Sequence, residues 1–209
     1  THNLLTLHDG VIDFNTNLGS VAAVRARDGK ILWATRYERA DFDAPVSGEA
    51  ATNFQRDLNP CVWWRGLLLA APSDSKRLLC LEAASGQLLW SRPASDIVHL
   101  LGISEGGKLI ASGHRLWWIE AATGETTARF PETKEAQPSG YGRGVLAGDV
   151  VYWPTKSEIY VFDQQTAKMI RQPIDLARRG LTGGNLIVAQ DRLLVTTAEK
   201  VAAFGEASP

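Results

Sequence analysis

Residues 81–90 read Leu81-Glu-Ala-Ala-Ser-Gly86-Gln-Leu-Leu-Trp90. A short apolar segment leads into a Ser-Gly pair, and a second apolar segment follows the pair and ends in tryptophan. Glycine at this position supplies the positive φ that a tight hairpin turn requires and that strains other residues. The stretch therefore predicts two short β-strands joined by a turn.

The same hairpin pattern occurs at three other places in the chain. They read Val24-Arg-Ala-Arg-Asp-Gly29-Lys-Ile-Leu-Trp33, Ile119-Glu-Ala-Ala-Thr-Gly124-Glu-Thr-Thr-Ala128 and Val161-Phe-Asp-Gln-Gln-Thr-Ala167-Lys-Met-Ile-Arg171. The turn positions 29, 86, 124 and 167 are 57, 38 and 43 residues apart. Two of these intervals match the period of about 40 residues of a four-stranded propeller blade, and the longer first interval indicates an insertion.

Each hairpin extends backwards into two more short strands that are bounded by Gly, Asp and Ser. The sequence therefore predicts an all-β fold, a β-propeller of four-stranded antiparallel blades with four complete blades and a partial fifth. We expect a single domain over residues 1–209. The predicted blades span roughly residues 4–36, 60–93, 97–130, 141–175 and, incomplete, 181–205, and residues 37–60 form a long insertion. The fourth blade is expected to end in a strand at 168–172.

Composition and charge exclude several classes of protein. The chain is 44% hydrophobic and 22% charged, with a formal net charge of −1. A nucleic-acid-binding protein would need a basic stripe to displace phosphate counterions, and none is present. No apolar run approaches the roughly 18–20 residues of a membrane-spanning helix. We therefore expect neither a nucleic-acid partner nor a transmembrane segment.

The two cysteines are expected to be free. Cys61 falls at the start of one blade's first strand and Cys80 falls in its third strand. Strands two places apart in a sheet are separated by roughly 9–10 Å. A disulfide needs Cα atoms within about 7 Å of each other, so the strand placement predicts two free thiols.

The repeated segments resemble the repeat of the PQQ (pyrroloquinoline quinone) enzyme-like propellers, whose consensus runs Ala-x-Asp-Ala-x-Thr-Gly-x-x-x-Trp. Residues 81–90 and 119–124 are the closest matches, although Glu82 and Glu120 replace the consensus aspartate. In the fourth repeat, Ala167 replaces the turn glycine and Arg171 replaces the tryptophan. The family includes quinoprotein alcohol dehydrogenases and the non-catalytic BamB-like scaffolds. The resemblance covers essentially the whole chain and supports the fold more than any chemistry.

The resemblance implies that the tryptophan at the end of a blade's outer strand packs between neighbouring blades. Trp33 and Trp90 occupy this position, and they are expected to be structural together with the turn glycines Gly29, Gly86 and Gly124. The other tryptophans are also expected to pack in the core, because both faces of an internal blade meet a neighbour. They are Trp63, Trp64, Trp117, Trp118 and Trp153.

A quinoprotein dehydrogenase of this family would need a full ring of blades, a calcium site of oxygen ligands and a catalytic aspartate. No set of Asp, Asn and Glu residues in this chain matches such ligands residue by residue, and the two cysteines are not adjacent. The four histidines show no metal-ligand spacing. We therefore expect no PQQ, no calcium, no other metal and no catalytic residue.

Two connections are candidates for a binding rim. Residues 37–60 and 131–143 each join an outermost strand to the next blade's innermost strand, so both should cross one rim of the propeller. Long loops in compact domains are usually functional or disordered. The candidate rim residues are Arg39, Asp41, Phe54, Arg56, Asp57, Asn59, Tyr141 and Arg143. A solvated loop without a partner is the alternative interpretation.

The leading functional hypothesis is a non-catalytic scaffold that binds a protein or peptide partner as one section of a larger bacterial protein. A fragment of a PQQ- and calcium-dependent dehydrogenase, completed by further blades, is the first alternative. A carbohydrate- or ligand-binding propeller is the second. The incomplete fifth blade would leave an unpaired strand edge, through which two copies could form a homodimer. Only the family resemblance favours an extracytoplasmic location.

Overall fold

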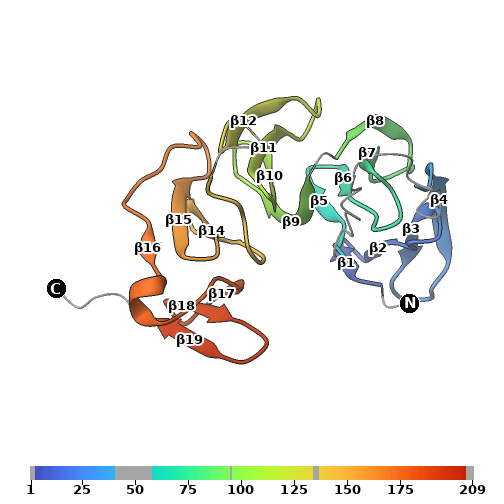
Figure 1. Ribbon diagram of the computed structural model, residues 1–209. Helices are drawn as coiled ribbons and strands as arrows, with labels where there is room; N and C mark the ends of the chain where they lie inside the picture. Colours follow the sequence, from blue (N-terminus) through green and yellow to red (C-terminus); the bar gives the residue numbers. More distant parts are fainter. Residues whose placement is uncertain (1–2, 41–57, 95, 134–136, 206–209) are drawn as a thin grey trace, which may run out of the picture. The chain divides into compact units, whose positions relative to one another are not determined.

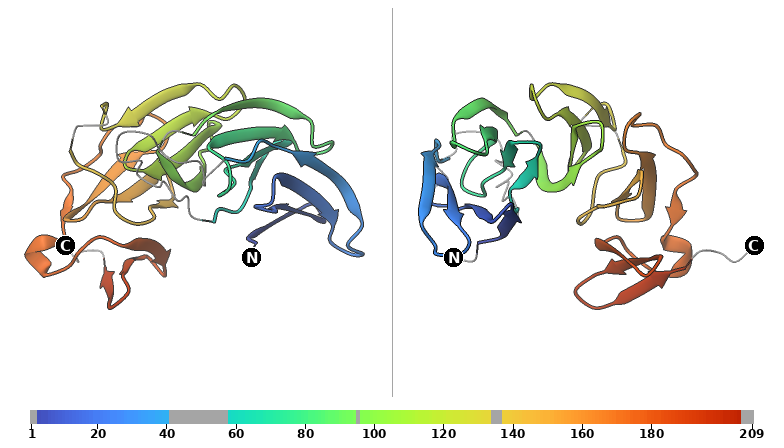
Figure 2. Two further views of the ribbon diagram at one scale, coloured as in Figure 1. Left: turned by 45° about the vertical axis from the view of Figure 1, so that its right-hand side comes forward. Right: turned by 180° about the vertical axis from the view of Figure 1, so that it is seen from behind.

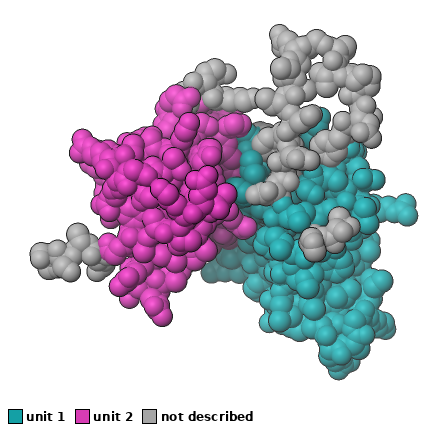
Figure 3. All heavy atoms as spheres, turned by 60° about the horizontal axis from the view of Figure 1, so that its bottom comes forward, with its two compact units in different colours: residues 1–100, 121–125 teal, residues 101–120, 126–209 magenta. Residues whose placement is uncertain are grey.

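The computed structural model describes residues 3–40, 58–94, 96–133 and 137–205. These residues form five antiparallel sheets, and in each sheet consecutive strands pair as a meander (Figure 1, Figure 2). The chain divides into two compact units (Figure 3). The first unit contains residues 1–100 and 121–125, and the second contains residues 101–120 and 126–209.

The first two sheets have four strands each. The first contains β1 (Leu5–His8), β2 (Val11–Asn15), β3 (Ser20–Arg25) and β4 (Ile31–Arg36). The second contains β5 (Val62–Trp64), β6 (Leu67–Ala70), β7 (Arg77–Glu82) and β8 (Leu88–Pro93). The first strands β1 and β5 are in contact, as expected for the innermost strands of neighbouring blades.

The third and fourth sheets also have four strands each, and the fifth has three among the described residues. The third contains β9 (Ile97–Ile103), β10 (Lys108–Gly113), β11 (Leu116–Glu120) and β12 (Thr126–Phe130). The fourth contains β13 (Val145–Ala147), β14 (Val150–Pro154), β15 (Glu158–Asp163) and β16 (Ile174–Asp175). A short 3₁₀ turn (Ala177–Arg179) leads to β17 (Asn185–Ala189), β18 (Arg192–Thr196) and β19 (Val201–Phe204).

The apolar runs of the middle strands are explained by burial on both faces of each sheet. Consecutive residues of β6, Leu68, Leu69 and Ala70, are all fully buried, and so are Trp118 and Ile119 of β11. A strand that is covered on both sides reads as a continuous hydrophobic run and not as an alternating one. The outer strand β4 has no fully buried residue. The predicted blades of four antiparallel strands are confirmed in the first three sheets, and the fourth sheet differs at its last strand.

The prediction of a strand at residues 168–172 is wrong. After the fourth turn, only Met169 forms a bridge to Phe162, and Ile170 donates one backbone hydrogen bond to Val161. The chain then leaves the sheet and pairs again at β16, opposite the start of β15. Arg171 stands where other repeats have the packed tryptophan, and Pro173 has no N–H to donate. A proline cannot continue the ladder as a donor, so the strand is interrupted before β16.

Trp33 in β4 packs on the turn of the second sheet. Its indole Nε1 donates a 2.9 Å hydrogen bond to the carbonyl of Ala83. A Cβ atom on Gly86 would lie less than 3.0 Å from the same indole ring. Gly86 is therefore required for two reasons, its φ of 74° and the space that the preceding blade's tryptophan occupies.

Trp90 in β8 repeats this arrangement one sheet further along. Its indole donates to the carbonyl of Ala121 at 3.0 Å, and a Cβ on Gly124 would again lie within 3.0 Å of the ring. The structural roles expected for Trp33, Trp90, Gly86 and Gly124 match these contacts. Gly29 has a φ of 69°, but a Cβ atom added there would have nothing within 4 Å, so only the turn itself needs glycine.

In the third sheet a tryptophan also donates a hydrogen bond to the next turn, but this tryptophan lies on the third strand of the sheet and not on the fourth. In the second sheet, Cys80 on β7 lies opposite Trp90 on β8. In the third, Trp118 on β11 lies opposite Ala128 on β12. The Trp118 indole then donates to the carbonyl of Gln164 in the next turn, at 3.1 Å. An indole therefore reaches the following turn from whichever of the two paired positions carries the tryptophan.

Ala167 occupies the turn position that glycine holds in the other repeats. Its φ is 57°, in the left-handed region that strains residues with a Cβ atom. The residue that would cover this turn is Ala128, which replaces the tryptophan, and both alanines pack against the same buried cluster. The cluster also contains Trp118, whose indole reaches this turn from the neighbouring strand.

Candidate functional site

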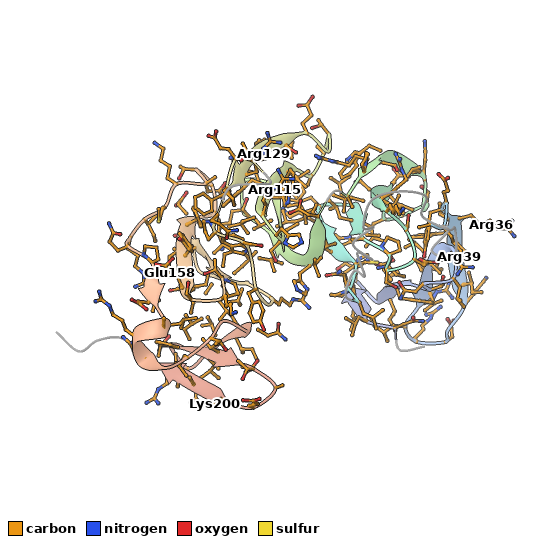
Figure 4. All side chains as sticks on the ribbon, in the orientation of Figure 1. Arg36, Arg39, Arg115, Arg129, Glu158 and Lys200 are labelled. Atoms are coloured by element: carbon orange, nitrogen blue, oxygen red, sulfur yellow. The ribbon has the colours of Figure 1, made fainter. Side chains whose placement is uncertain are left out.

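Arg39 follows β4 in the first unit, where Asp74 fixes its guanidinium group (Figure 4). Arg39 Nε donates to Asp74 Oδ2 at 3.0 Å. The same carboxylate accepts the Tyr37 hydroxyl at 2.5 Å and the N–H of Gly19 at 3.0 Å. Burial, and then the contact with Asp74, raise the pKa of Tyr37 well above its usual value, so the hydroxyl remains a donor. The predicted rim residue Arg39 is thus largely exposed, but a carboxylate already neutralises its charge.

The prediction that Asn59 belongs to an exposed rim is wrong. Its side chain is buried, with 4% of the residue exposed. Its Oδ1 accepts the N–H of Leu100 at 2.8 Å, and its Nδ2 donates to the carbonyl of Val98 at 2.7 Å. One amide can serve as donor and acceptor together, so Asn59 satisfies the backbone of β9. The remaining rim residues of the insertion lie outside the described residues: Asp41, Phe54, Arg56 and Asp57.

Tyr141, in the second unit, lines a hollow of about 650 Å³, called here the Tyr141 hollow. Its side chain is 53% exposed. The other walls are formed by Gly142 and by residues 182–185 and 196–199. Arg143 lies beside the hollow, where its N–H donates to Asn185 Oδ1 at 2.9 Å. The structure therefore brings Tyr141 and Arg143 to one place, on the connection that leads into β13.

Glycines allow the walls of the Tyr141 hollow to approach closely. A Cβ atom on Gly142 would lie less than 3.0 Å from the carbonyl oxygen of Gly184. A Cβ atom on Gly184 would meet the carbonyl oxygen of Thr196 at a similarly short distance. Backbone groups consequently form part of the surface, together with the side chains of Thr182 and Glu199. One exposed aromatic ring among hydrogen-bonding groups suits recognition of a polar, partly apolar ligand such as a peptide.

A second hollow in the second unit is not predicted from the sequence. It measures about 640 Å³ and carries three guanidinium groups, from Arg171, Arg179 and Arg192, and we name it the arginine hollow. Its lining also includes Tyr152 and Phe204. These residues come from four separate stretches of the chain, so no local motif indicates the site.

A buried His–Asp pair lies in the first unit. His8 Nε2 and Asp13 Oδ2 are 2.5 Å apart, and Asp13 has no exposed surface. Burial raises the pKa of Asp13, and the contact with His8 opposes that rise. His8 also stacks on Trp63, with ring centroids 4.9 Å apart. Trp63 thus covers one face of the His8 ring.

The cysteines do not supply a nucleophile to this pair. Cys61 and Cys80 are free and buried, as the strand placement predicts. Burial first, and the charge of Asp13 second, raise the pKa of Cys61 far above its usual range. The reactive form of cysteine is the thiolate, so a thiol that stays protonated is inert.

None of the regions that the structure describes brings three or more His, Cys, Asp or Glu side chains together for a metal ion. Calcium takes about six to eight oxygen ligands, mostly from carboxylates and carbonyls. The same regions contain no helix long and apolar enough to cross a membrane.

A family model described as outer membrane protein assembly factor BamB matches residues 17–208. The chain belongs to this family. BamB from Moraxella catarrhalis has a similar crystal structure, with a TM-score of 0.68 and 14% identity over 96% of this chain and 56% of that one. The fold is therefore a PQQ-like β-propeller with a partial last blade, as predicted.

Two further solved structures share the BamB-family fold. The computationally designed protein Ika8 has a TM-score of 0.64 and 12% identity, over 96% of this chain and 57% of its own. Quinohemoprotein alcohol dehydrogenase from Comamonas testosteroni has a TM-score of 0.63 and 16% identity, over 95% of this chain and 38% of its own. No curated protein matches the sequence. The chain spans a little over half the length of the first two structures, and identities this low support the fold alone.

Proposed function

We propose that this chain is one section of a larger bacterial protein. It forms part of a BamB-like propeller that is not catalytic and that binds a protein partner. The partner is a protein of outer membrane assembly, in keeping with the description of the family. A propeller holds its connecting loops on rigid blades, and binding sites are often built on loops that a rigid scaffold positions.

The observation that carries the proposal is the exposed Tyr141 at the mouth of a polar hollow. Tyrosine is enriched at protein interfaces because it offers a large apolar ring and a hydroxyl group. The N–H of Tyr141 donates to the carbonyl of Pro154 at 2.8 Å, so its backbone is held before a partner binds and less conformational entropy would be lost on binding.

The proposal is tested by replacing Tyr141 with a photoreactive amino acid in the parent protein, expressed in its own cells. We expect irradiation to give a discrete cross-linked product whose second component is an envelope-assembly protein by mass spectrometry. Met169 is the matched control, because it is 47% exposed, belongs to the same unit and lies outside both hollows. Equal products from positions 141 and 169, or none from either, would contradict the proposal.

A further inference from the structure

The arginine hollow combines an apolar floor with a cationic rim. The floor includes Tyr152, Ile174, Leu193 and Phe204, of which Leu193 is buried. The rim carries the three arginines 171, 179 and 192, together with the carboxylate of Asp191. The local charge is therefore positive, although the chain as a whole has a formal net charge of −1.

Two of the three guanidinium groups are positioned by aromatic rings. Arg171 Cζ lies 5.8 Å from the centroid of the Tyr152 ring, and Arg179 Cζ lies 5.0 Å from that of Phe204. A guanidinium over an aromatic face is attracted by the ring quadrupole and keeps its N–H groups available. Both side chains are thus partly ordered before any ligand arrives.

The charges on the rim are not neutralised within the part of the chain that the structure describes. No ion pair joins Arg171, Arg179 or Arg192 to a carboxylate in those regions. The neighbouring residue Arg178 behaves differently, because its Nε lies 3.1 Å from Asp175 Oδ2. Two consecutive arginines therefore differ: one is paired with a carboxylate, and the other faces a hollow.

We propose that the arginine hollow binds an acidic peptide segment that carries one aromatic or aliphatic side chain. Carboxylates of the segment would form charge-assisted, bidentate hydrogen bonds with the guanidinium groups. Its apolar side chain would enter the space above Tyr152 and Phe204, near the position where other repeats place a packed tryptophan. This inference rests on the proposed function and adds a second contact surface for a protein partner.

An acidic peptide fits the hollow better than a free anion does. A volume of about 640 Å³ is far larger than a phosphate ion requires, and much of the lining is apolar. Arginine and aromatic residues are also the side chains that dominate binding energy at protein interfaces. A ligand with both carboxylates and an apolar side chain uses every part of this lining.

The test uses the whole chain and a fluorescein-labelled peptide in which Asp and Glu residues flank one tryptophan. We expect saturable binding by fluorescence anisotropy that weakens as salt is added. The separate substitutions Arg171→Gln, Arg179→Gln and Arg192→Gln should each weaken binding by about tenfold. The matched control Arg178→Gln should bind as the unmodified chain does, because that arginine is already paired.

Three results would overturn the inference. The first is equal binding of a peptide with Gln and Asn in place of the acidic residues. The second is unchanged binding in all three variants, with unfolding midpoints that match the unmodified chain. The third is binding to phosphatidylglycerol vesicles with no binding of the acidic peptide. If Tyr141 still cross-links its partner in any of these cases, the proposed function stands and only the arginine hollow is rejected.

Discussion

Gly86 and Gly29 occupy equivalent turns with similar backbones, at φ values of 74° and 69°. Only Gly86 has a tryptophan ring against the position of a Cβ atom. Gly29→Ala should therefore cost only the backbone strain, about 1–2 kcal/mol of the free energy of unfolding. Gly86→Ala should cost about 1–3 kcal/mol more, because the added methyl group displaces Trp33. Urea denaturation measures both values, and equal losses would contradict the packing role assigned to Gly86.

Ala167 offers the opposite substitution. Its φ of 57° strains an alanine but not a glycine. Ala167→Gly should stabilise the protein by about 0.5–1 kcal/mol, after the greater flexibility of glycine in the unfolded chain is subtracted. Ala203→Gly in β19 is the control, and it should destabilise by a similar amount because that residue lies in a strand. A loss of stability in Ala167→Gly would show that the turn is not strained.

Asp13 makes stability depend on pH. Burial raises its folded pKa above the ordinary value of 3.8, despite the opposing effect of His8. Between 3.8 and the folded pKa, the folded state holds more protons than the unfolded state, so stability falls as the pH rises. Asp13→Asn cannot ionise and should lose this component.

The free energy of unfolding of Asp13→Asn, relative to the unmodified chain, should therefore increase as the pH rises from 3.8 and then level off. Chemical denaturation of both proteins over a series of pH values measures the difference. A difference that does not change with pH would mean that Asp13 ionises as readily in the folded state as in the unfolded one.

At the scale of strands, the sequence predicts best where the local pattern and the packing agree. β15, β17 and β18 are each a short apolar run between turn residues, which is the pattern that predicts a strand. The composition of Lys168-Met-Ile predicts a strand, but Pro173 follows it, and pairing beyond the bridge at Met169 resumes only at β16. The missing tryptophan alone does not explain the difference, because β12 carries Ala128 at the equivalent position and pairs along its length.

The same limit applies to the candidate site. Tyr141 can be predicted because an aromatic residue on a polar connection suggests a contact surface. Asn59 cannot be assigned correctly from the sequence, because its role depends on the backbone of Val98 and Leu100, about 40 residues away. The arginine hollow combines residues from four stretches, so it becomes recognisable only in three dimensions.

Trp33 in β4 and Trp90 in β8 are expected to stabilise the first unit strongly. Trp33→Ala and Trp90→Ala should each lower the free energy of unfolding by about 3–5 kcal/mol, because each leaves a cavity and an unpaired carbonyl. Trp63→Ala is the control, since that residue is 36% exposed and should lose less. Unchanged denaturation midpoints in both Trp33→Ala and Trp90→Ala would contradict the packing of outer strands on the following turns.

For the molecule as a whole, the five sheets belong to a propeller fold, and the chain covers 56% of the similar BamB structure. The partners and activity of the complete protein are therefore matters for experiment. Pairing of β19 with a second copy of the chain also stays a prediction. What distinguishes the proposed scaffold from a quinoprotein enzyme is whether this part of the propeller binds the quinone and calcium.

The most direct measurement is a titration of the chain with PQQ in the presence of Ca²⁺, followed by the fluorescence of its seven tryptophans. A tryptophan close to the quinone would be quenched on binding, so the fluorescence reports occupancy. The scaffold account predicts no saturable quenching, with or without the metal. Saturable quenching that is abolished by a calcium chelator would contradict it and would place a quinone site in this chain.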